Sequence, residues 1–551
     1  MTGDSLFWAD KYARQVIERV ESEPALQKIA KKKGYICLDE KTPSGHIHIG
    51  SGRGWIIHDL VAKALRDLGV KGRFILSSDD IDPMDKPPAG LDSKKYEQYM
   101  GVPFYKIPSP ESRYKSYADY YFRECTDKFE EFGIEAELES TGNWYERGDF
   151  NPTIKTALDN HEKIRSIYER IYKKTVASDK LPFNPICENC GKIGTTVAYE
   201  WNSDTEMLKY RCAPDIVKWA QGCGHDGEIS PYDGNGKLPW KVEWAAKWPT
   251  VGVLFETAGK DHFTVGGSRT VAIAICDEVF DYTPPIPSSR KEIGGAYEFF
   301  NIGGKKMSTS KGEGVGFAEI AEKIPPKLLR YLLVRTRPHA ALDFDPFGTN
   351  KLLLLAESYD KCERIYYGEE KADNDREEAH EKRVYELSNP GAVSTQILPQ
   401  IPFGYASMVV QACNFDIDSA IDKLKQSEYI PEKLSKEGLG HLKERLEMAG
   451  SWVSHYAPDE YKFTLLDKLQ KGLKIESAEK NAILNIVSKI DISSEKELEA
   501  LIYETAKELG SPGNFFRTFY IVLLGKEKGP RLASFLKTLS QERVEKLTKY
   551  L

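Results

Sequence analysis

The sequence predicts an α/β chain whose first half is built on a parallel sheet and whose last part is entirely helical. Three observations predict this fold class. A strand–turn–helix–strand pattern covers residues 34–77, a cysteine-rich segment interrupts the α/β pattern at about 180–238, and only helical periodicity remains from about 400 to 551. Because 551 residues are too many for a single hydrophobic core, we expect three or four domains.

The first strand–helix–strand unit sets the direction of the sheet. Residues 34–39 form a short apolar strand, and residues 73–77 form the next one after Gly69 ends the intervening helix. The helix is expected at 52–68, because its apolar residues recur at a spacing of 3.6: Ile56, Ile57, Leu60, Val61, Ala64, Leu65 and Leu68. Two strands joined in this way run parallel, with a right-handed crossover.

The remaining elements follow the same reasoning. Helices are expected at 114–132 and 153–172, and the α/β pattern resumes after the cysteine-rich segment with a strand at 253–256, a helix at 268–280 and a strand at 297–301. Strand signals fade from about 316, where amphipathic helices begin, and the charged segment 372–380 is expected to be a solvated linker or helix end.

The composition excludes several classes of protein. The chain is 40% apolar and 29% charged, it has no apolar run of the roughly 18 residues that a membrane span requires, and its first ten residues do not resemble a secretion signal. We therefore expect a cytoplasmic protein. A net charge of -7 argues against a protein that coats nucleic acid with its whole surface, but binding of a polyanion needs only a local basic face. Residues 511–551 carry a net charge of +5, a pattern that suits an RNA backbone and equally suits an ordinary solvated helix face.

The turn after the first strand has the features of a phosphate site. It reads Pro43-Ser44-Gly45-His46-Ile47-His48-Ile49-Gly50-Ser51 and leads into the N-terminus of a helix, where backbone N–H groups and the helix dipole attract anions. Gly45 and Gly50 allow a nucleotide to approach the backbone closely, and His48 can donate a hydrogen bond to a phosphate oxygen. Taken alone, the segment could also be a plain helix-capping turn.

A second phosphate-handling segment lies at 303–312. Lys306 stands in a glycine-rich loop that could close over pyrophosphate, with Ser308 and Ser310 as further donors. An exposed basic turn is the alternative for this segment. The two segments together, in this order and with a doubly wound pattern between them, indicate one reaction: activation of a carboxylic acid by ATP as an adenylate.

The cysteines indicate a metal site in a reducing compartment. Nine is an odd number, and four of them cluster as Cys187-x-x-Cys190, Cys212 and Cys223, in a Gly- and Pro-rich segment without an apolar core of its own. Four thiolates with this spacing suit a structural Zn²⁺, with His225 as a substitute or second-site ligand. Free buried cysteines are the alternative.

Both phosphate-handling segments resemble the signatures of class I aminoacyl-tRNA synthetases. His48-Ile49-Gly50-Ser51 is similar to the HIGH signature, and Lys306-Met307-Ser308-Thr309-Ser310 to the KMSKS signature. Two positions depart from the family pattern, because Ser51 replaces a histidine and Thr309 replaces a lysine. The resemblance implies a Rossmann-like catalytic domain in which His48 and Lys306 are catalytic. It also implies that ATP binds to this set of residues: Pro43, Gly45, His48, Gly50, Ser51, Gly266, Gly267, Lys306, Met307, Ser308 and Ser310.

The resemblance extends to the class I lysyl-tRNA synthetases over about residues 34–345. It is carried by four further segments: Trp240-Lys241-Val242-Glu243-Trp244, Phe255 to His262, Gly266-Gly267-Ser268 and Tyr297-Glu298. By this resemblance the amino-acid pocket is formed by Thr42, Asp79, Trp240, His262 and Tyr297, and either Asp79 or Asp80 receives the substrate α-ammonium. The family has glycine where this chain has Glu40. Aromatic walls and an anionic end suit a lysine side chain, which is a long apolar stem with an ammonium at its end.

The resemblance also implies an overall organisation and a set of partners. We expect a catalytic domain in two halves at 1–179 and 239–315, a zinc-binding insertion at 180–238, a connecting region at 316–390 and a helical anticodon-binding domain at 391–551. The expected partners are L-lysine, ATP with Mg²⁺ and a lysine-accepting tRNA, and the expected state is a monomer. A glutamyl- or glutaminyl-type synthetase and a non-catalytic RNA-binding relative are the alternatives.

Overall fold

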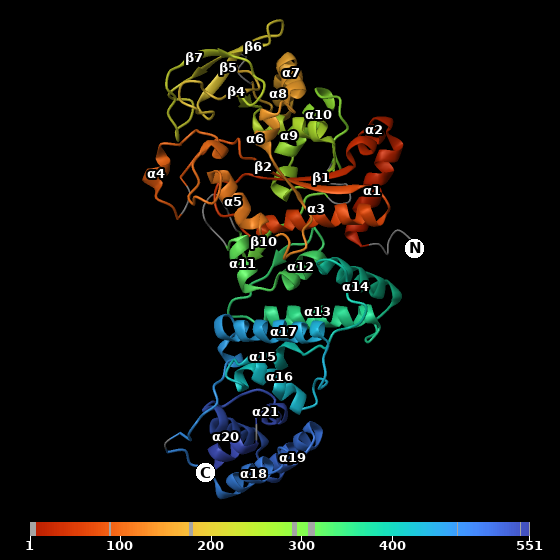
Figure 1. Cartoon of the computed structure of the whole chain (residues 1–551), viewed down its shortest axis with the longest axis vertical. Coiled ribbons are helices and arrows are strands. Elements are labelled where there is room, and N and C mark those ends of the chain that lie inside the picture. Colours follow the sequence, from red (N-terminus) through yellow and green to blue (C-terminus); the bar gives the residue numbers. More distant parts are fainter. Residues whose placement is uncertain are drawn as a thin grey trace. The chain divides into compact units, whose positions relative to one another are not determined.

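The computed structural model describes residues 7–87, 90–175, 180–288, 295–306, 315–470, 472–539, 541–549 and 551, with the backbone alone for Lys305 and Lys306. The chain forms two compact units. The first comprises Met1–Phe344 with Asp373–Val393, and the second comprises Asp345–Ala372 with Ser394–Leu551. Figure 1 shows the whole chain with its elements labelled.

A four-stranded parallel sheet is the centre of the first unit. Its strands are β1 (Tyr35–Lys41), β2 (Gly72–Ser78), β3 (Glu137–Ser140) and β9 (Val253–Phe255), in the order β3-β2-β1-β9. The strands expected at 34–39, 73–77 and 253–256 are thereby confirmed. β1 has β2 on one side and β9 on the other, so the carboxyl ends of these strands border the crevice where open parallel sheets bind ligands.

Helices cover both faces of this sheet. The helix α3 (Gly50–Asp67) connects β1 to β2 and contacts both strands, and its buried residues extend from Gly52 to Leu65. The helices α1 (Trp8–Ser22), α2 (Pro24–Lys33), α9 (Trp240–Lys247) and α10 (Ser268–Glu278) complete the layers, with α1 beside α3 and α9 beside α10 (Figure 1). Gly72 lets α3 approach the sheet closely, since a Cβ at that position would lie 2.2 Å from the Ala62 carbonyl oxygen.

Two of the helices expected from the sequence have different bounds in the structure. The segment 114–132 contains the shorter helix α5 (Tyr117–Thr126), which begins after Ser116, whose side chain accepts a hydrogen bond from the Asp119 N–H. The segment 153–172 is split at Asn160 into α7 (Asn151–Asp159) and α8 (His161–Tyr172). Short helices α4 (Ser93–Glu97) and α6 (Thr141–Glu146) lie in the same part of the chain.

The insertion after α8 contains two small antiparallel sheets. β5 (Thr196–Asn202), β6 (Met207–Cys212) and β7 (Asp226–Ile229) form one of them, and β4 (Asn184–Pro185) pairs with β8 (Gly236–Lys237) where the insertion begins and ends. The β4–β8 pair closes the insertion, and α9 follows β8 along the chain.

The first unit also contains a separate three-stranded sheet. β10 (Phe300–Ile302) pairs with β11 (Lys305–Lys306) and with β12 (Leu342–Asp343). The strand expected at 297–301 thus begins at residue 300 and belongs to this small sheet. The helices α11 (Phe317–Lys323), α12 (Pro326–Arg335) and α14 (Asp375–Ser388) complete the unit, and α12 contacts both α3 and α14.

The second unit is helical in the part that the structure describes. Its helices are α13 (Lys351–Tyr367), α15 (Phe403–Ala412), α16 (Ile417–Gln426), α17 (Lys436–His455), α18 (Ser477–Val487), α19 (Glu495–Glu508), α20 (Pro512–Leu524), α21 (Leu532–Thr538) and α22 (Gln541–Thr548). Phe515 and Tyr520 are buried in its core, and Phe516 is half-buried. Among the described helices of both units, we find none with the length and apolar character that a membrane crossing needs.

Candidate active site and cysteine cluster

The first phosphate-handling turn connects β1 to the N-terminus of α3. Pro43 and Gly45 are buried, whereas His48, Gly50 and Ser51 are half-buried at the start of the helix. The N–H groups of Ser51 and Gly52 already donate to the carbonyl oxygens of His48 and Ile49, at 3.1 and 2.9 Å. Fewer backbone donors are therefore open to a phosphate than the sequence suggested, so the helix dipole and the His48 ring would carry more of the attraction.

The second segment returns to this same turn. β10 and β11 form a hairpin through Gly303 and Gly304, both with positive φ, and the Gly304 N–H donates to Asp343 Oδ1 at 2.9 Å. The chain is described again from Val315, whose carbonyl oxygen accepts from the Ile49 N–H at 3.1 Å, while Gly316 forms a β-bridge with His48. Lys306 therefore ends the hairpin, and the segment that follows it leads to the backbone of His48. The expected ligands Met307, Ser308 and Ser310 lie outside the described residues.

A buried arginine connects α3 to this hairpin. The guanidinium of Arg53, 3% exposed, donates to four carbonyl oxygens, those of Phe299, Arg337, Pro338 and Ala340, at 2.6–3.2 Å. Phe299 directly precedes β10, and Ala340 lies shortly before β12. Arg53 thus fixes the small sheet that carries Lys306 against the helix that follows His48.

Carboxylates gather at the carboxyl ends of β1 and β2. Glu40 stands near the end of β1, and Asp79 follows β2, with its N–H donating to the Lys41 carbonyl oxygen at 2.9 Å. Thr42, an expected pocket residue, donates to Asp82 Oδ2 at 3.2 Å. Asp80 instead accepts from Ser140 Oγ at 2.5 Å and from the Gly142 N–H at 2.8 Å, and burial raises its pKa to about 6. Asp80 is therefore bonded to β3 and to the start of α6, whereas the backbone of Asp79 is bonded to the end of β1.

Two aromatic residues of the expected pocket, Trp240 at the start of α9 and His262, lie beside each other. Trp240, Trp244 and Trp248 follow each other at helical spacing, and the His262 ring lies 6.3 Å from the Trp240 ring and 5.4 Å from the Trp244 ring. Trp240 is half-exposed, whereas Trp244 is buried and donates from its indole N–H to Glu256 Oε1 at 2.8 Å. The structure therefore brings Trp240 and His262 together as a partly open aromatic wall.

His262 and Tyr297 are held by the loop after β9. His262 Nδ1 lies 2.9 Å from Ser268 Oγ, and burial lowers the pKa of the ring, so the imidazole is neutral at physiological pH. Tyr297 is paired through its backbone with Gly259, and burial followed by the nearby Asp39 carboxylate raises its phenol pKa. Gly266 and Gly267 lie just before α10, where a Cβ on Gly267 would approach the His262 carbonyl oxygen to 2.7 Å.

The sequence reasoning missed two buried lysines beside the pocket. Lys247 ends α9, and its ammonium lies 2.5 Å from Asp79 Oδ1, 3.0 Å from Glu40 Oε1 and 3.6 Å from Glu243 Oε1. Lys237, in β8, contacts Asp82 and lies 3.1 Å from Glu243 Oε1. The available signal was the spacing of Glu243 and Lys247, which places them one turn apart on the helix that carries the tryptophans.

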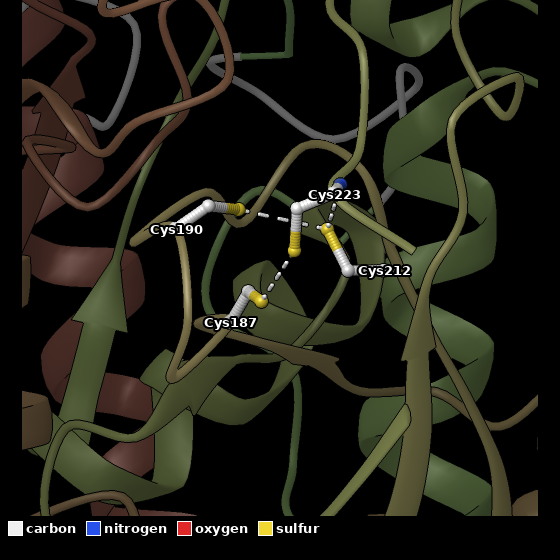
Figure 2. A group of neighbouring side chains, drawn as sticks. All are labelled: Cys187, Cys190, Cys212 and Cys223. Carbon is white, nitrogen blue, oxygen red and sulfur yellow. Dashed lines mark hydrogen bonds between the residues drawn. The ribbon is translucent and has the colours of Figure 1, made fainter. Parts of the chain in front are cut away.

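The four clustered cysteines converge in the insertion (Figure 2). The Sγ atoms of Cys187, Cys190, Cys212 and Cys223 all lie within 4.8 Å of one another, with 3.6 Å between Cys187 and Cys223 and 3.7 Å between Cys190 and Cys212. In the part of the chain that the structure describes, His225 is not a member of this group. Its ring lies beside Tyr210, with Nε2 4.0 Å from Glu188 Oε2.

Comparisons with known proteins agree on one family. A family model described as "tRNA synthetases class I (K)" matches residues 6–391. The lysine–tRNA ligase of Methanocaldococcus jannaschii is 32% identical over 551 residues, which cover 98% of this chain and 98% of that protein. The lysine–tRNA ligases of Pyrococcus horikoshii and Treponema pallidum are each 33% identical, over 548 and 558 residues, again with 98% of both chains covered.

Proposed function

The chain belongs to the class I lysyl-tRNA synthetases, and from this premise we propose that it activates L-lysine with ATP and transfers the lysyl group to the 3′-terminal adenosine of a tRNA. The lysine carboxylate would attack the α-phosphorus of ATP, which forms lysyl-adenylate and releases pyrophosphate. The tRNA hydroxyl would then attack the adenylate carbonyl carbon and release AMP.

The backbone junction between the two motifs carries this proposal. The chain that leaves Lys306 rejoins the turn containing His48 through Val315 and Gly316, so a nucleotide at the α3 N-terminus would meet both motifs. His48 would donate to a phosphate oxygen, and the Lys306 ammonium would stabilise the charge that develops on the leaving pyrophosphate. Mg²⁺ would arrive with the phosphates of ATP.

The other assignments concern the amino acid. Asp79 would receive the α-ammonium of lysine at the carboxyl end of β2, with Thr42 beside it. Trp240, His262 and Tyr297 would line the remainder of the pocket. A neutral imidazole at His262 suits a cationic substrate, because a charged ring would repel the side-chain ammonium. The relatives' names favour lysine over the glutamate and glutamine alternatives.

The cysteine cluster would hold a structural Zn²⁺. A tetrahedron with Zn–S bonds of about 2.3 Å has edges of about 3.8 Å. The distances of 3.6 and 3.7 Å within two of the cysteine pairs fit that geometry, and thiolates are preferred ligands of zinc. The ion would crosslink the loop at Cys187 and Cys190 to β6 and to Cys223, and with four thiolates it would need no ligand from His225.

The domain assignment follows the family. We assign 1–179 and 239–315 to the catalytic domain, 180–238 to the zinc-binding insertion, 316–390 to the connecting region and 391–551 to anticodon binding. We propose that the protein acts as a monomer.

Charging of tRNA tests the proposal. The purified chain should attach lysine to a lysine-accepting tRNA in the presence of ATP and Mg²⁺. Lys306→Ala and His48→Ala should each lower the rate by about two orders of magnitude, because each removes a donor to a developing charge. Lys323→Ala is the matched control, since Lys323 pairs with Glu319 on the exposed side of α11 and should leave the rate unchanged. No charging by the wild-type protein, or equal rates for all variants, would contradict the proposal.

A further inference from the structure

Six charged side chains form a buried cluster under the amino-acid pocket. The cluster consists of Lys237, Lys247, Glu40, Asp79, Asp82 and Glu243, contributed by β1, β8, α9 and the segment after β2. The two lysine side chains are 4% and 1% exposed, which is rare for lysine and requires that each ammonium be paired. Such a cluster is costly to bury.

Lys247 is the member that connects two strands. Its ammonium reaches Glu40 on β1 and Asp79 at the end of β2, and these strands are adjacent in the sheet. Lys237 contacts neither of these carboxylates and instead binds Asp82 and Glu243. Both lysines contact Glu243 Oε1, at 3.1 and 3.6 Å, but their other partners differ, so their roles can be separated by experiment.

The contacts of Asp79 leave one of its oxygens available. Oδ1 accepts from Lys247 at 2.5 Å and from Thr141 Oγ1 at 3.0 Å. Among the described residues, no hydrogen bond reaches Oδ2 of Asp79, and the side chain is 15% exposed. Two donors on a single oxygen fix the rotation of the carboxylate, so the second oxygen has a defined direction.

The electrostatic effect of Lys247 differs between its two partners. Burial alone would raise the pKa of Asp79, but the ammonium groups of Lys247 and Lys237 outweigh it and lower the pKa, so Asp79 is a carboxylate at neutral pH. Burial dominates at Glu40 and raises its pKa well above the usual range despite the same ammonium. The lysines thus hold Asp79 in its anionic form, and an anion is what a substrate ammonium requires.

We propose that Lys247 is a positioning residue for lysine recognition, which holds Asp79 with Oδ2 directed to the α-ammonium of the substrate and uses Glu40 as its second anchor. This inference rests on the proposed function, since it assumes that Asp79 binds the amino acid. It assigns a role to Glu40 as well: Glu40 anchors Lys247 and does not contact the substrate.

The test is lysine-dependent ATP–pyrophosphate exchange by the full-length protein. Lys247→Met should raise the KM for lysine about tenfold or more, in the range for a hydrogen bond between charged groups, and should change the KM for ATP less than about threefold. Lys237→Met is the control, and it should raise the KM for lysine less than about threefold.

Inhibition by a lysine analogue distinguishes a positioning role of Lys247 from a purely structural one. 6-Aminohexanoate is lysine without the α-amine, so the ratio of its Ki to the KM for lysine reports recognition of the α-ammonium. This ratio should fall about tenfold or more in Lys247→Met and should be retained in Lys237→Met. If Lys247→Met does not fold, as judged by thermal melting, the double variant with Glu40→Gln leaves fewer unpaired buried carboxylates and should show the same fall.

The outcomes separate this inference from the proposed function. An unchanged ratio in Lys247→Met or the double variant, or an equal fall in Lys237→Met, would overturn the role of Lys247 while lysine-dependent exchange by the wild type stands. Absence of lysine-dependent exchange in the wild type would overturn the proposed function itself.

Discussion

Gly54 offers a sharp test of how tightly the pocket is built. It lies in the second turn of α3, and a Cβ at this position would lie 2.6 Å from Asp39 Oδ2 and 3.0 Å from Tyr297 Oη. Neither neighbour can move freely. Asp39 Oδ1 accepts from the Glu40 N–H at 2.9 Å, and the Tyr297 backbone is bonded to Ala258 and Lys260. Gly54→Ala should therefore displace both side chains.

The size of the effect follows from these distances. Ordinary van der Waals contact begins at 3.4 Å, so the Asp39 carboxylate would have to retreat by about 0.8 Å. In an unconstrained helix, alanine stabilises by about 0.5–1 kcal/mol relative to glycine, and the clash should cancel that gain. A displacement of about 1 Å near a reacting substrate costs up to about 100-fold, so kcat/KM for lysine should fall about 10- to 100-fold.

Gly440 provides the matched control. It is an exposed glycine within α17, and a Cβ there would meet nothing within 4 Å. Gly440→Ala should raise the stability by about 0.5–1 kcal/mol in urea unfolding without an effect on lysine-dependent exchange. If Gly54→Ala were stabilised equally and kept its kcat/KM for lysine, the reasoning about the constrained contact of Asp39 and Tyr297 would be refuted.

Three further predictions concern other parts of the first unit. Arg53→Lys should lower the free energy of unfolding by about 2–4 kcal/mol in urea titrations and should slow ATP–pyrophosphate exchange, because a lysine cannot bond all four carbonyl oxygens that hold the β10 sheet. An unchanged urea midpoint would contradict this role. Burial lowers the pKa of His58 to about 3, so the unfolded state binds its proton first as the pH falls below about 6.5. This group should therefore lower the free energy of unfolding by about 1.4 kcal/mol for each pH unit between pH 6 and 4. His58→Gln should remove this contribution, and the same pH dependence in wild type and variant would contradict it. Protein purified without chelator should contain one equivalent of zinc by elemental analysis, and Cys190→Ser should lose it; zinc-free wild-type protein of full stability would argue against the metal.

The sequence sufficed for features that depend on local pattern. The strands β1, β2 and β9 and the helix α3 follow from apolar periodicity and turn residues, and the gathering of the four cysteines follows from their spacing.

Other features depend on partners that are distant in the chain. The strand β3 reads Glu-Leu-Glu-Ser, pairs with β2 alone and has no apolar run that could indicate it. Apart from Glu243, the carboxylates that pair with Lys237 and Lys247 lie more than 150 residues away in the chain, and lysine is ordinarily a surface residue. The hydrogen bonds of Asp80 to Ser140 and Gly142, which separate its role from that of Asp79, likewise required the folded structure.

The central claim is that a nucleotide binds between the His48 turn and the Lys306 hairpin beside a pocket for a cationic amino acid. Its most direct test is ATP–pyrophosphate exchange by the purified protein with lysine, glutamate and glutamine offered separately. The account predicts exchange with lysine at least about 100-fold faster than with either of the others, because an unpaired carboxylate or amide in an anionic pocket is strongly disfavoured. Faster exchange with glutamate or glutamine than with lysine would contradict it.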